Sequence, residues 1–293
     1  MPIELVTLSQ TFLNGLTLSV IYMLFASGFT LIFGIMGLLN FPHGPIYAFG
    51  AYIVFYVMGW LGSSLNIYGL SIIIAILFCG LVGVMMERFF YRPFFGQLAQ
   101  QVSVALGLSL IFSGLTLVIA GPTEKGIPPI ISGSANLGGI YLPYSRLIII
   151  ILSAVVMIGL LLLIKRTKIG YFMRAVTEDS WAAQLEGIKL TRVTMFALGL
   201  SCALAGFVGA SVMTLFNLAT PYMGGEVLSI ALLVIMIGGL GSIPGAILGS
   251  LILGFMQSFS QTYVGGGAIA ELVGFILVYI ILLVRPRGLM GHE

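Results

Sequence analysis

Side chains able to carry covalent chemistry are scarce in this sequence. Its two histidines are His43 and His292, and its two cysteines, Cys79 and Cys202, lie inside apolar runs. No nucleophile, base and orienting acid are placed to assemble a catalytic triad, and the cysteines lack the spacing of a disulfide framework or a metal site. The phosphate-binding pattern G-x-x-x-x-G-K-S/T is also missing, so the chain is not expected to hold ATP itself. We therefore predict no catalytic residues, no cofactor and no metal.

A few polar residues interrupt the apolar runs, and these are the candidates for contact with a transported solute. Glu271 is the one carboxylate clearly inside an apolar run; such groups usually face the interior of a bundle, although an ion pair or partial solvation also explains it. Asn40, Pro42 and His43 lie where two prolines interrupt regular backbone hydrogen bonds. Such a break either lines a pathway or forms a cytoplasmic turn between two helices. We take these four as candidate pathway residues.

The helices that hold these residues are expected to cross a membrane. Hydrophobic residues make up 59% of the chain and charged residues 7%, whereas soluble domains carry about 25% charged residues. A bilayer core about 30 Å thick needs roughly 20 apolar residues per helical crossing. We predict an all-α integral membrane protein, one domain over residues 1–293 with about eight or nine transmembrane helices. The runs lie near 11–36, 45–62, 68–87, 98–120, 147–164, 193–216, 227–241, 245–264 and 268–284.

The seventh and eighth of these runs form a segment broken by glycine and proline. Non-helical backbone at membrane depth occurs where protein buries it or where it lines a cavity. Two half-helices or a re-entrant hairpin therefore fit this region as well as two full crossings do. The interrupting residues are Gly238, Gly239, Gly241, Pro244, Gly245 and Gly249.

Basic residues favour one orientation in the membrane. If each run crosses once, ten of the twelve Lys and Arg residues fall on one side, and Lys125 and Arg146 fall on the other. Cytoplasmic loops carry an excess of Lys and Arg. We therefore expect the N-terminus outside and the C-terminus in the cytoplasm, with an external loop near 121–146 and a cytoplasmic loop near 165–192.

The expected cytoplasmic loop contains the one strongly polar helical pattern of the chain. Thr177 can cap a short helix there, and Gly187 suits its end. Trp181, Leu185 and Ile188 would form an apolar stripe along that helix. The stripe either rests on lipid headgroups or docks, as a coupling helix, into a groove of a cytoplasmic protein. Acidic residues beside the stripe argue mildly against an anionic lipid surface.

Four stretches together give the chain a family resemblance. They are LNFPHGPIYAFGAY at 39–52, ERFFYRPF at 87–94, GYFMRAVTEDSWAAQLEGI at 170–188 and GGLGSIPGAILGSLILG at 238–254. In this order and with these intervals they resemble the permease subunits of branched-chain amino acid ABC transporters. The resemblance covers essentially the whole chain, although no single stretch is decisive.

The resemblance implies a set of partners and a place in the cell. The fold would be that of the type II ABC importer permeases, embedded in the lipid of a bacterial inner membrane. A second homologous permease, two cytoplasmic ABC ATPases and a periplasmic substrate-binding protein would complete the importer; no nucleic acid is expected. The resemblance favours the coupling helix over the lipid-resting helix. The predicted coupling residues are Arg174, Glu178, Asp179, Trp181, Ala182, Ala183, Leu185, Glu186 and Gly187.

The implied function is import of branched-chain or similar hydrophobic amino acids, powered by the partner ATPases. Two alternatives stay open at this point. One keeps the family but changes the solute to urea, a short amide or another small carboxylate. The other is an ion-coupled secondary carrier, which would transport without partners and would need intramembrane coupling groups. Such coupling groups would be several acids or histidines within the apolar runs. The sequence does not have them, and this favours the importer.

Overall fold

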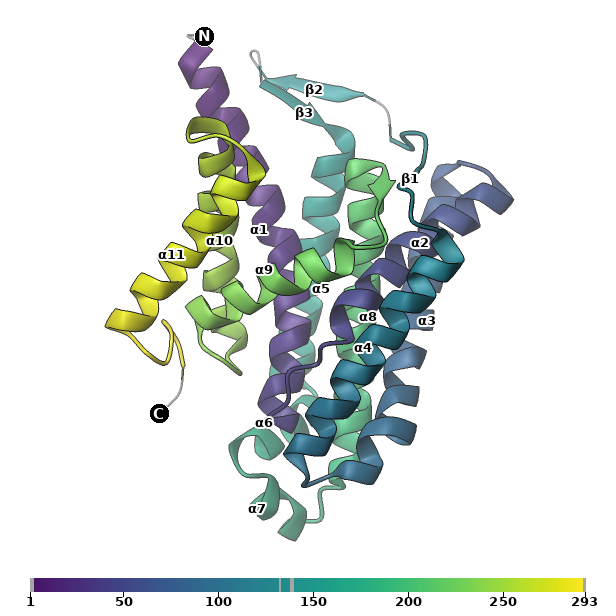
Figure 1. Ribbon diagram of the computed structural model, residues 1–293, viewed down its shortest axis with the longest axis vertical. Coiled ribbons are helices and arrows are strands. Elements are labelled where there is room, and N and C mark those ends of the chain that lie inside the picture. The colour runs from purple at the N-terminus through teal and green to yellow at the C-terminus, as the bar shows by residue number, and fades with distance from the viewer. Residues whose placement is uncertain (1–2, 132, 138–139, 292–293) are drawn as a thin grey trace.

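Nine apolar helices make up most of the described chain (Figure 1). The computed structural model describes residues 3–131, 133–137 and 140–291, so that His292 lies outside it. The helices are α1 (Ile3–Met36), α2 (His43–Leu61), α3 (Leu65–Met86), α4 (Leu98–Ala120), α5 (Tyr144–Arg166), α8 (Leu190–Phe216), α9 (Met223–Gly238), α10 (Ile243–Tyr263) and α11 (Gly267–Val284). Seven are long and apolar enough to cross a membrane, and α9 and α11 are shorter apolar helices. The predicted all-α membrane fold is confirmed.

The glycine- and proline-broken segment forms two helices of unequal length. α9 has 16 residues, which at about 1.5 Å per residue gives roughly 24 Å, less than a bilayer core. Figure 1 shows it lying obliquely across the bundle, whereas α4 and α5 follow the long axis. Gly239 and Gly241 have positive φ angles of 107° and 79° and turn the chain into α10, where the Ser242 hydroxyl accepts a hydrogen bond from the Gly245 N–H at 3.1 Å.

Close helix contacts hold the centre of the bundle together. α1 and α8 are buried over most of their length, whereas α4 and α5 are exposed over most of theirs. Between α8 and α2, a Cβ atom added to Gly209 would lie 1.9 Å from the carbonyl oxygen of Tyr47. A side chain does not fit at that distance. Small residues of this kind allow membrane helices to pack backbone against backbone.

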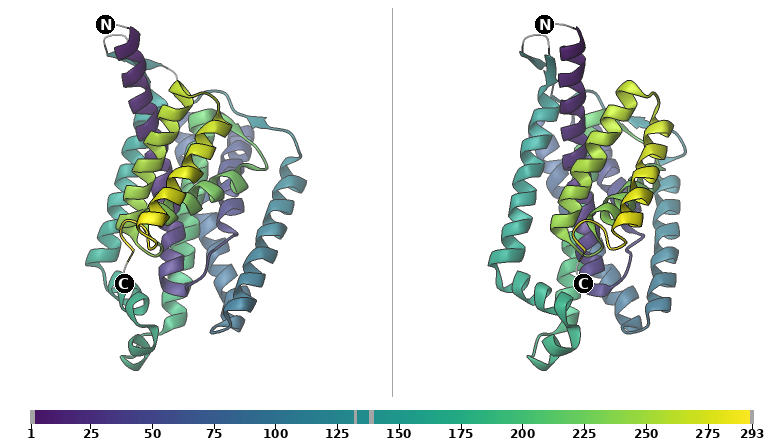
Figure 2. Two further views of the ribbon diagram at one scale, coloured as in Figure 1. Left: turned by 60° about the vertical axis from the view of Figure 1, so that its left-hand side comes forward. Right: turned by 90° about the vertical axis from the view of Figure 1, so that its left-hand side faces the viewer.

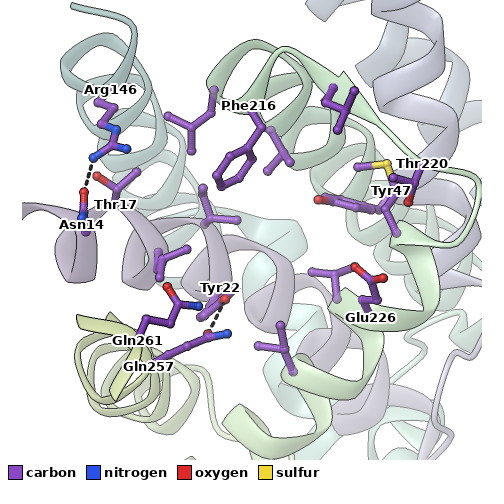
Figure 3. Close-up of a pocket in the computed structure, with 18 residues that line it drawn as sticks. Asn14, Thr17, Tyr22, Tyr47, Arg146, Phe216, Thr220, Glu226, Gln257 and Gln261 are labelled. Carbon is purple, nitrogen blue, oxygen red and sulfur yellow. Dashed lines mark hydrogen bonds between the residues drawn. The ribbon is translucent and has the colours of Figure 1, made fainter. Parts of the chain in front are cut away.

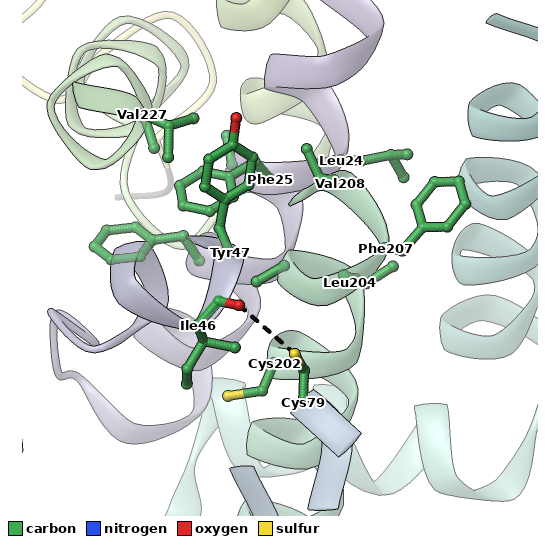
Figure 4. Packing of buried hydrophobic residues seen from close by; sticks show 14 of the residues in the cluster. Leu24, Phe25, Ile46, Tyr47, Cys79, Cys202, Leu204, Phe207, Val208 and Val227 are labelled. Atoms are coloured by element: carbon green, nitrogen blue, oxygen red, sulfur yellow. Dashed lines mark hydrogen bonds between the residues drawn. The ribbon is translucent and has the colours of Figure 1, made fainter. Parts of the chain in front are cut away.

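Apolar side chains from α1, α2, α3 and α8 fill the space around this contact (Figure 4). The fully buried ring of Phe25 meets the ring of Tyr47 edge-on, with 5.5 Å between centroids. Cys79 on α3 and Cys202 on α8 are free and buried in the same region. Both are core residues, as their position in apolar runs predicts.

Short elements occupy the two ends of the bundle. The hairpin β2–β3 and the antiparallel pair β1–β4 lie at the end that holds the N-terminus (Figure 1). α6 and α7 lie at the opposite end, and α7 projects beyond the other helices in both views of Figure 2. The bounds are η1 (Glu87–Tyr91, a π-helix), η2 (Arg92–Phe94), β1 (Lys125–Gly126), β2 (Ser134–Leu137), β3 (Ile140–Pro143), α6 (Lys168–Glu178), α7 (Ser180–Leu185) and β4 (Leu218–Ala219).

Apart from Arg285 and Arg287, which follow α11, the basic residues divide between the two ends as the crossing pattern predicts. Lys125 and Arg146 belong to β1 and to the start of α5, at the end with the hairpin. The basic residues of η1, η2, α6 and the adjoining ends of α5 and α8 gather at the end with α6 and α7. One end of the bundle is therefore strongly basic and the other is not.

Candidate functional site

A chamber of about 510 Å³ opens between α1, α5, α8, α9 and α10 (Figure 3). Its lining comes from residues 14–22 of α1, Tyr47 of α2, the first turn of α5, the last turns of α8 and α10 and the first half of α9. The start of α5 and the ends of α8 and α10 lie toward the end of the bundle that carries the hairpin (Figure 1). The volume falls within the roughly 300–1,000 Å³ of small-molecule sites.

Hydrogen-bonding groups face the chamber from several helices. The Tyr22 hydroxyl on α1 donates to Oε1 of Gln257 on α10 at 2.6 Å. This bond leaves the two N–H groups of the Gln257 amide to other acceptors. On another part of the wall, the Arg146 guanidinium donates to Oδ1 of Asn14 (Figure 3). The chamber therefore offers donors that a bound anionic group can use.

Two opposite charges line the chamber without pairing with each other. Arg146 stands on one side and Glu226, from the first turn of α9, on the opposite side (Figure 3). Among the described residues, the one ion pair joins Arg92 to Glu87, at 3.0 Å. Ionised groups in such surroundings are costly unless a partner compensates them. This arrangement suits a solute that brings charges of both signs.

Apolar side chains cover much of the remaining wall. They come from α1, α8 and α9 and give the chamber a surface against which a hydrocarbon group can pack. A mostly apolar cavity with a few polar groups is the usual form of a small-molecule site. These side chains are Leu18, Ile21, Leu215, Phe216, Val227 and Ile230.

Asn40, Pro42 and His43 do not line this chamber; they join α1 to α2 inside the protein. Asn40 and His43 are fully buried. The Tyr91 hydroxyl donates to Oδ1 of Asn40 at 3.1 Å, and Nε2 of His43 lies 3.2 Å from the carbonyl oxygen of Phe25. Pro42 precedes the first residue of α2. These contacts tie the helix junction to its neighbours, and a pathway role for the three residues stays a prediction.

Glu271, the fourth predicted pathway residue, lies on α11 outside the chamber lining. Its side chain is exposed. It nevertheless lies close enough to Tyr22, on the chamber wall, to interact with it electrostatically. Its contact with solute also stays a prediction.

The sequence reasoning missed Glu226, Gln257 and Tyr22 as site residues and used Arg146 only as a sign of orientation. The apolar run is expected to begin near 227, so Glu226 falls one residue before it, whereas α9 begins at Met223 and includes Glu226. A carboxylate at the start of an apolar run was therefore the signal in the sequence that could have indicated this site residue. Tyr22 and Gln257 are 235 positions apart in the chain, and local patterns do not bring them together.

The predicted coupling loop contains two helices, not one, and Thr177 does not cap the second. Thr177 lies in the last turn of α6, where its hydroxyl donates to the Met173 carbonyl at 2.9 Å. Asp179 instead caps α7, and its carboxylate accepts hydrogen bonds from the N–H groups of Trp181 and Ala182 at 2.9 and 3.0 Å. α7 ends before Gly187, whose φ is +84°.

The apolar stripe of this loop is only partly covered. Trp181 and Leu185 are each 69% exposed, whereas Ile188 lies beyond the end of α7 and packs against the core. Ala183, on the other side of α7, is 4% exposed. α7 thus packs one side on the protein and presents two large apolar side chains outward.

The remaining predicted coupling residues support or flank these helices. Arg174 donates to the carbonyl oxygen of Ile164 in the last turn of α5 and so ties α6 to that helix. Glu178 is the last residue of α6, and Glu186 is the C-cap of α7. Whether any residue of this loop contacts an ATPase stays a prediction.

A family of membrane permeases matches almost the whole chain. The family model described as branched-chain amino acid transport system / permease component matches residues 11–284. The permease protein BraD of the high-affinity branched-chain amino acid transport system of Pseudomonas aeruginosa is 31% identical over 299 residues, covering 97% of this chain and 95% of BraD. The corresponding LivH of Escherichia coli strain K12 is 30% identical over 300 residues, with the same coverage.

A second type of permease and one solved structure are also similar. The LivM permease protein of the Escherichia coli system is 26% identical over 314 residues, covering 94% of this chain and 68% of LivM. The solved structure of PsaBC from Streptococcus pneumoniae in complex with Fab matches with a TM-score of 0.55 at 13% identity, covering 94% of this chain and 91% of that one. At this identity the likeness concerns the fold alone.

Proposed function

Because the chain belongs to the family of branched-chain amino acid transport permeases, we propose that it is the membrane subunit of an ABC importer for branched-chain or similar hydrophobic amino acids. The match of the family model over residues 11–284 carries this proposal. The chamber supports it, since an apolar wall with both charge signs suits such solutes better than urea, a short amide or a simple carboxylate.

A second, homologous permease completes the pathway in this proposal. Glu271 is exposed on α11 of the single chain and lies outside the chamber lining. Exposed carboxylates are costly against lipid. A second permease would cover this side of α11. Two types of permease in the Escherichia coli system, LivH and LivM, resemble this chain. This is consistent with a second permease that differs in sequence from this chain.

Two cytoplasmic ABC ATPases supply the energy in this proposal. They dock on α6 and α7, where Trp181 and Leu185 are exposed near the two ends of α7. A six-residue helix is marginal alone, and its outward apolar side chains suit the groove of a partner. Movement of the ATPases would then be transmitted through α6 to α5, which Arg174 joins.

The proposed site of action is a bacterial inner membrane, with the N-terminus outside and the C-terminus in the cytoplasm. The end with α6 and α7 carries most of the basic residues, and cytoplasmic loops are enriched in them. The hairpin β2–β3 at the other end would then face a periplasmic substrate-binding protein.

Purification of the tagged chain from its native membrane tests this assignment. Two ATPase subunits and a second permease are expected to co-purify at fixed stoichiometry, and the isolated chain is expected to bind no ATP at millimolar concentration. A chain that purifies alone and still transports, or that binds ATP by itself, would contradict the proposal.

A further inference from the structure

We propose that the chamber is a binding site within the permease for a zwitterionic amino acid in transit, and that Glu226 holds its ammonium group. This inference rests on the proposed function and adds to it the residues that recognise the solute. It requires the permease itself, and not only a delivery protein, to distinguish amino acids from other small molecules.

The position of the chamber fits a site between the outer surface and the middle of the bundle. Its α1 lining runs from Asn14 to Tyr22, a distance of about 12 Å along the helix axis at 1.5 Å per residue. The chamber therefore extends over two helical turns. Figure 1 shows the start of α5, which carries Arg146, nearer the end with the hairpin than α9, which carries Glu226. A solute entering from that end passes Arg146 first.

The inner part of the chamber has complementary groups for both charges of an amino acid. Glu226 faces the open space from one side, and Gln257 faces it from α10 (Figure 3). Because Tyr22 donates to Oε1 of Gln257, the amide N–H groups stay available to a carboxylate. The Glu226 carboxylate, which has no cationic partner among the described residues, is a strong acceptor for an ammonium group.

The apolar wall accounts for the remaining part of the solute. Ile21, Val227 and Ile230 line the chamber beside these polar groups. Removal of hydrocarbon surface from water favours binding, so a branched hydrocarbon side chain is favoured over a hydrogen atom or a polar group. Arg146 stands on the opposite side of the chamber from Glu226 (Figure 3) and donates to Asn14. It is placed to attract the carboxylate at entry.

Equilibrium binding of tritiated leucine to the nanodisc-embedded importer, without nucleotide and without the binding protein, tests the inference. Leucine is expected to compete at least tenfold better than 4-methylpentanoate, which lacks the ammonium group. Glu226→Gln is expected to lower leucine affinity at least tenfold. Glu4→Gln, which removes an exposed carboxylate in the first turn of α1, is expected to change it less than twofold.

The outcomes separate this inference from the proposed function. If wild-type importer shows ATP-driven leucine uptake with its binding protein but binds 4-methylpentanoate as tightly as leucine, or binds neither, the chamber site is refuted and the function stands. Unchanged leucine affinity in Glu226→Gln has the same meaning. The competition by 4-methylpentanoate uses wild-type protein, so it decides the question even if the variant fails to assemble. Absence of ATP-driven uptake by the wild-type importer would refute both.

Discussion

Replacement of Leu185 by Asp is expected to release the ATPases and leave the membrane bundle intact. The side chain is 69% exposed in the single chain. Complete burial of a leucine side chain contributes roughly 1.5–3 kcal/mol, so covering the exposed two thirds contributes about 1–2 kcal/mol to docking. An aspartate loses this contribution and adds the cost of a poorly satisfied polar group, about 1–3 kcal/mol. The sum, about 2–5 kcal/mol, weakens docking by between about thirtyfold and several thousandfold.

The same substitution has little effect on the bundle, because α7 lies beyond the membrane helices (Figure 2). Surface substitutions of this kind usually change stability by less than about 0.5 kcal/mol. Size-exclusion chromatography of the tagged chain is expected to show normal pairing with the second permease and loss of the ATPases, and a transport assay is expected to show loss of uptake. Gln184→Asp is the matched control, since it adds the same charge to α7 at an exposed polar residue. ATPases retained at the wild-type ratio with Asp at 185 would refute the docking of α7.

Three further predictions concern orientation and packing. Cysteines introduced at 128–131, which are exposed or half-buried, are expected to react with a membrane-impermeant maleimide in intact cells, whereas cysteines in α7 react only after lysis; the reverse pattern would invert the topology. Gly209→Ala is expected to lower the thermal midpoint of unfolding, because the added Cβ would lie 1.9 Å from the Tyr47 carbonyl oxygen. Overpacking of this kind costs about 1–3 kcal/mol. Gly159→Ala is the control, since a Cβ there meets nothing within 4 Å; an equal loss in both variants would contradict the packing argument. Glu87→Ala removes a fully buried carboxylate that accepts hydrogen bonds from Arg92 and Thr194. The Arg92 side chain is 38% exposed and keeps contact with solvent, so the free energy of unfolding is expected to fall by about 1–3 kcal/mol, the cost of a lost hydrogen-bond partner in a buried site; an unchanged midpoint would show that this contact contributes nothing.

The membrane helices were predictable because the signal is long and repeated. Every expected apolar run corresponds to a helix, with ends that differ by a few residues in most cases. The largest difference is at the start of α1, which begins at Ile3 and not near residue 11. Its first turns carry Glu4, Thr7, Ser9 and Gln10, so hydropathy alone stops before the helix does. Hydropathy finds the part of a helix that lies in lipid, and the backbone can continue beyond it.

Local capping could be predicted as a type of interaction but not at the correct residue. Thr177 and Asp179 are both good N-caps, and the choice between them depends on where α6 ends. α6 begins at Lys168, capped by Thr167, and continues through Thr177. The length of α6 depends on its packing against neighbouring helices, and the sequence of the loop alone carries no information on that packing.

The chamber could not be predicted from the sequence, because its lining comes from six helices far apart in the chain. The buried positions of Asn40 and His43 have the same origin. Their partners Tyr91 and Phe25 lie 51 and 18 residues away. A break in a helix indicates where the backbone needs other hydrogen-bond partners, but it does not tell whether protein or solute supplies them.

Uptake by purified protein in liposomes tests the central claim most directly. Proteoliposomes holding the complete importer, with ATP on the ATPase side and the leucine-loaded binding protein on the other, are expected to accumulate leucine. Proteoliposomes holding this chain alone are expected to accumulate none, with ATP or under a proton or sodium gradient. Leucine accumulation by the chain alone under an ion gradient would contradict the assignment as an ATPase-driven permease subunit.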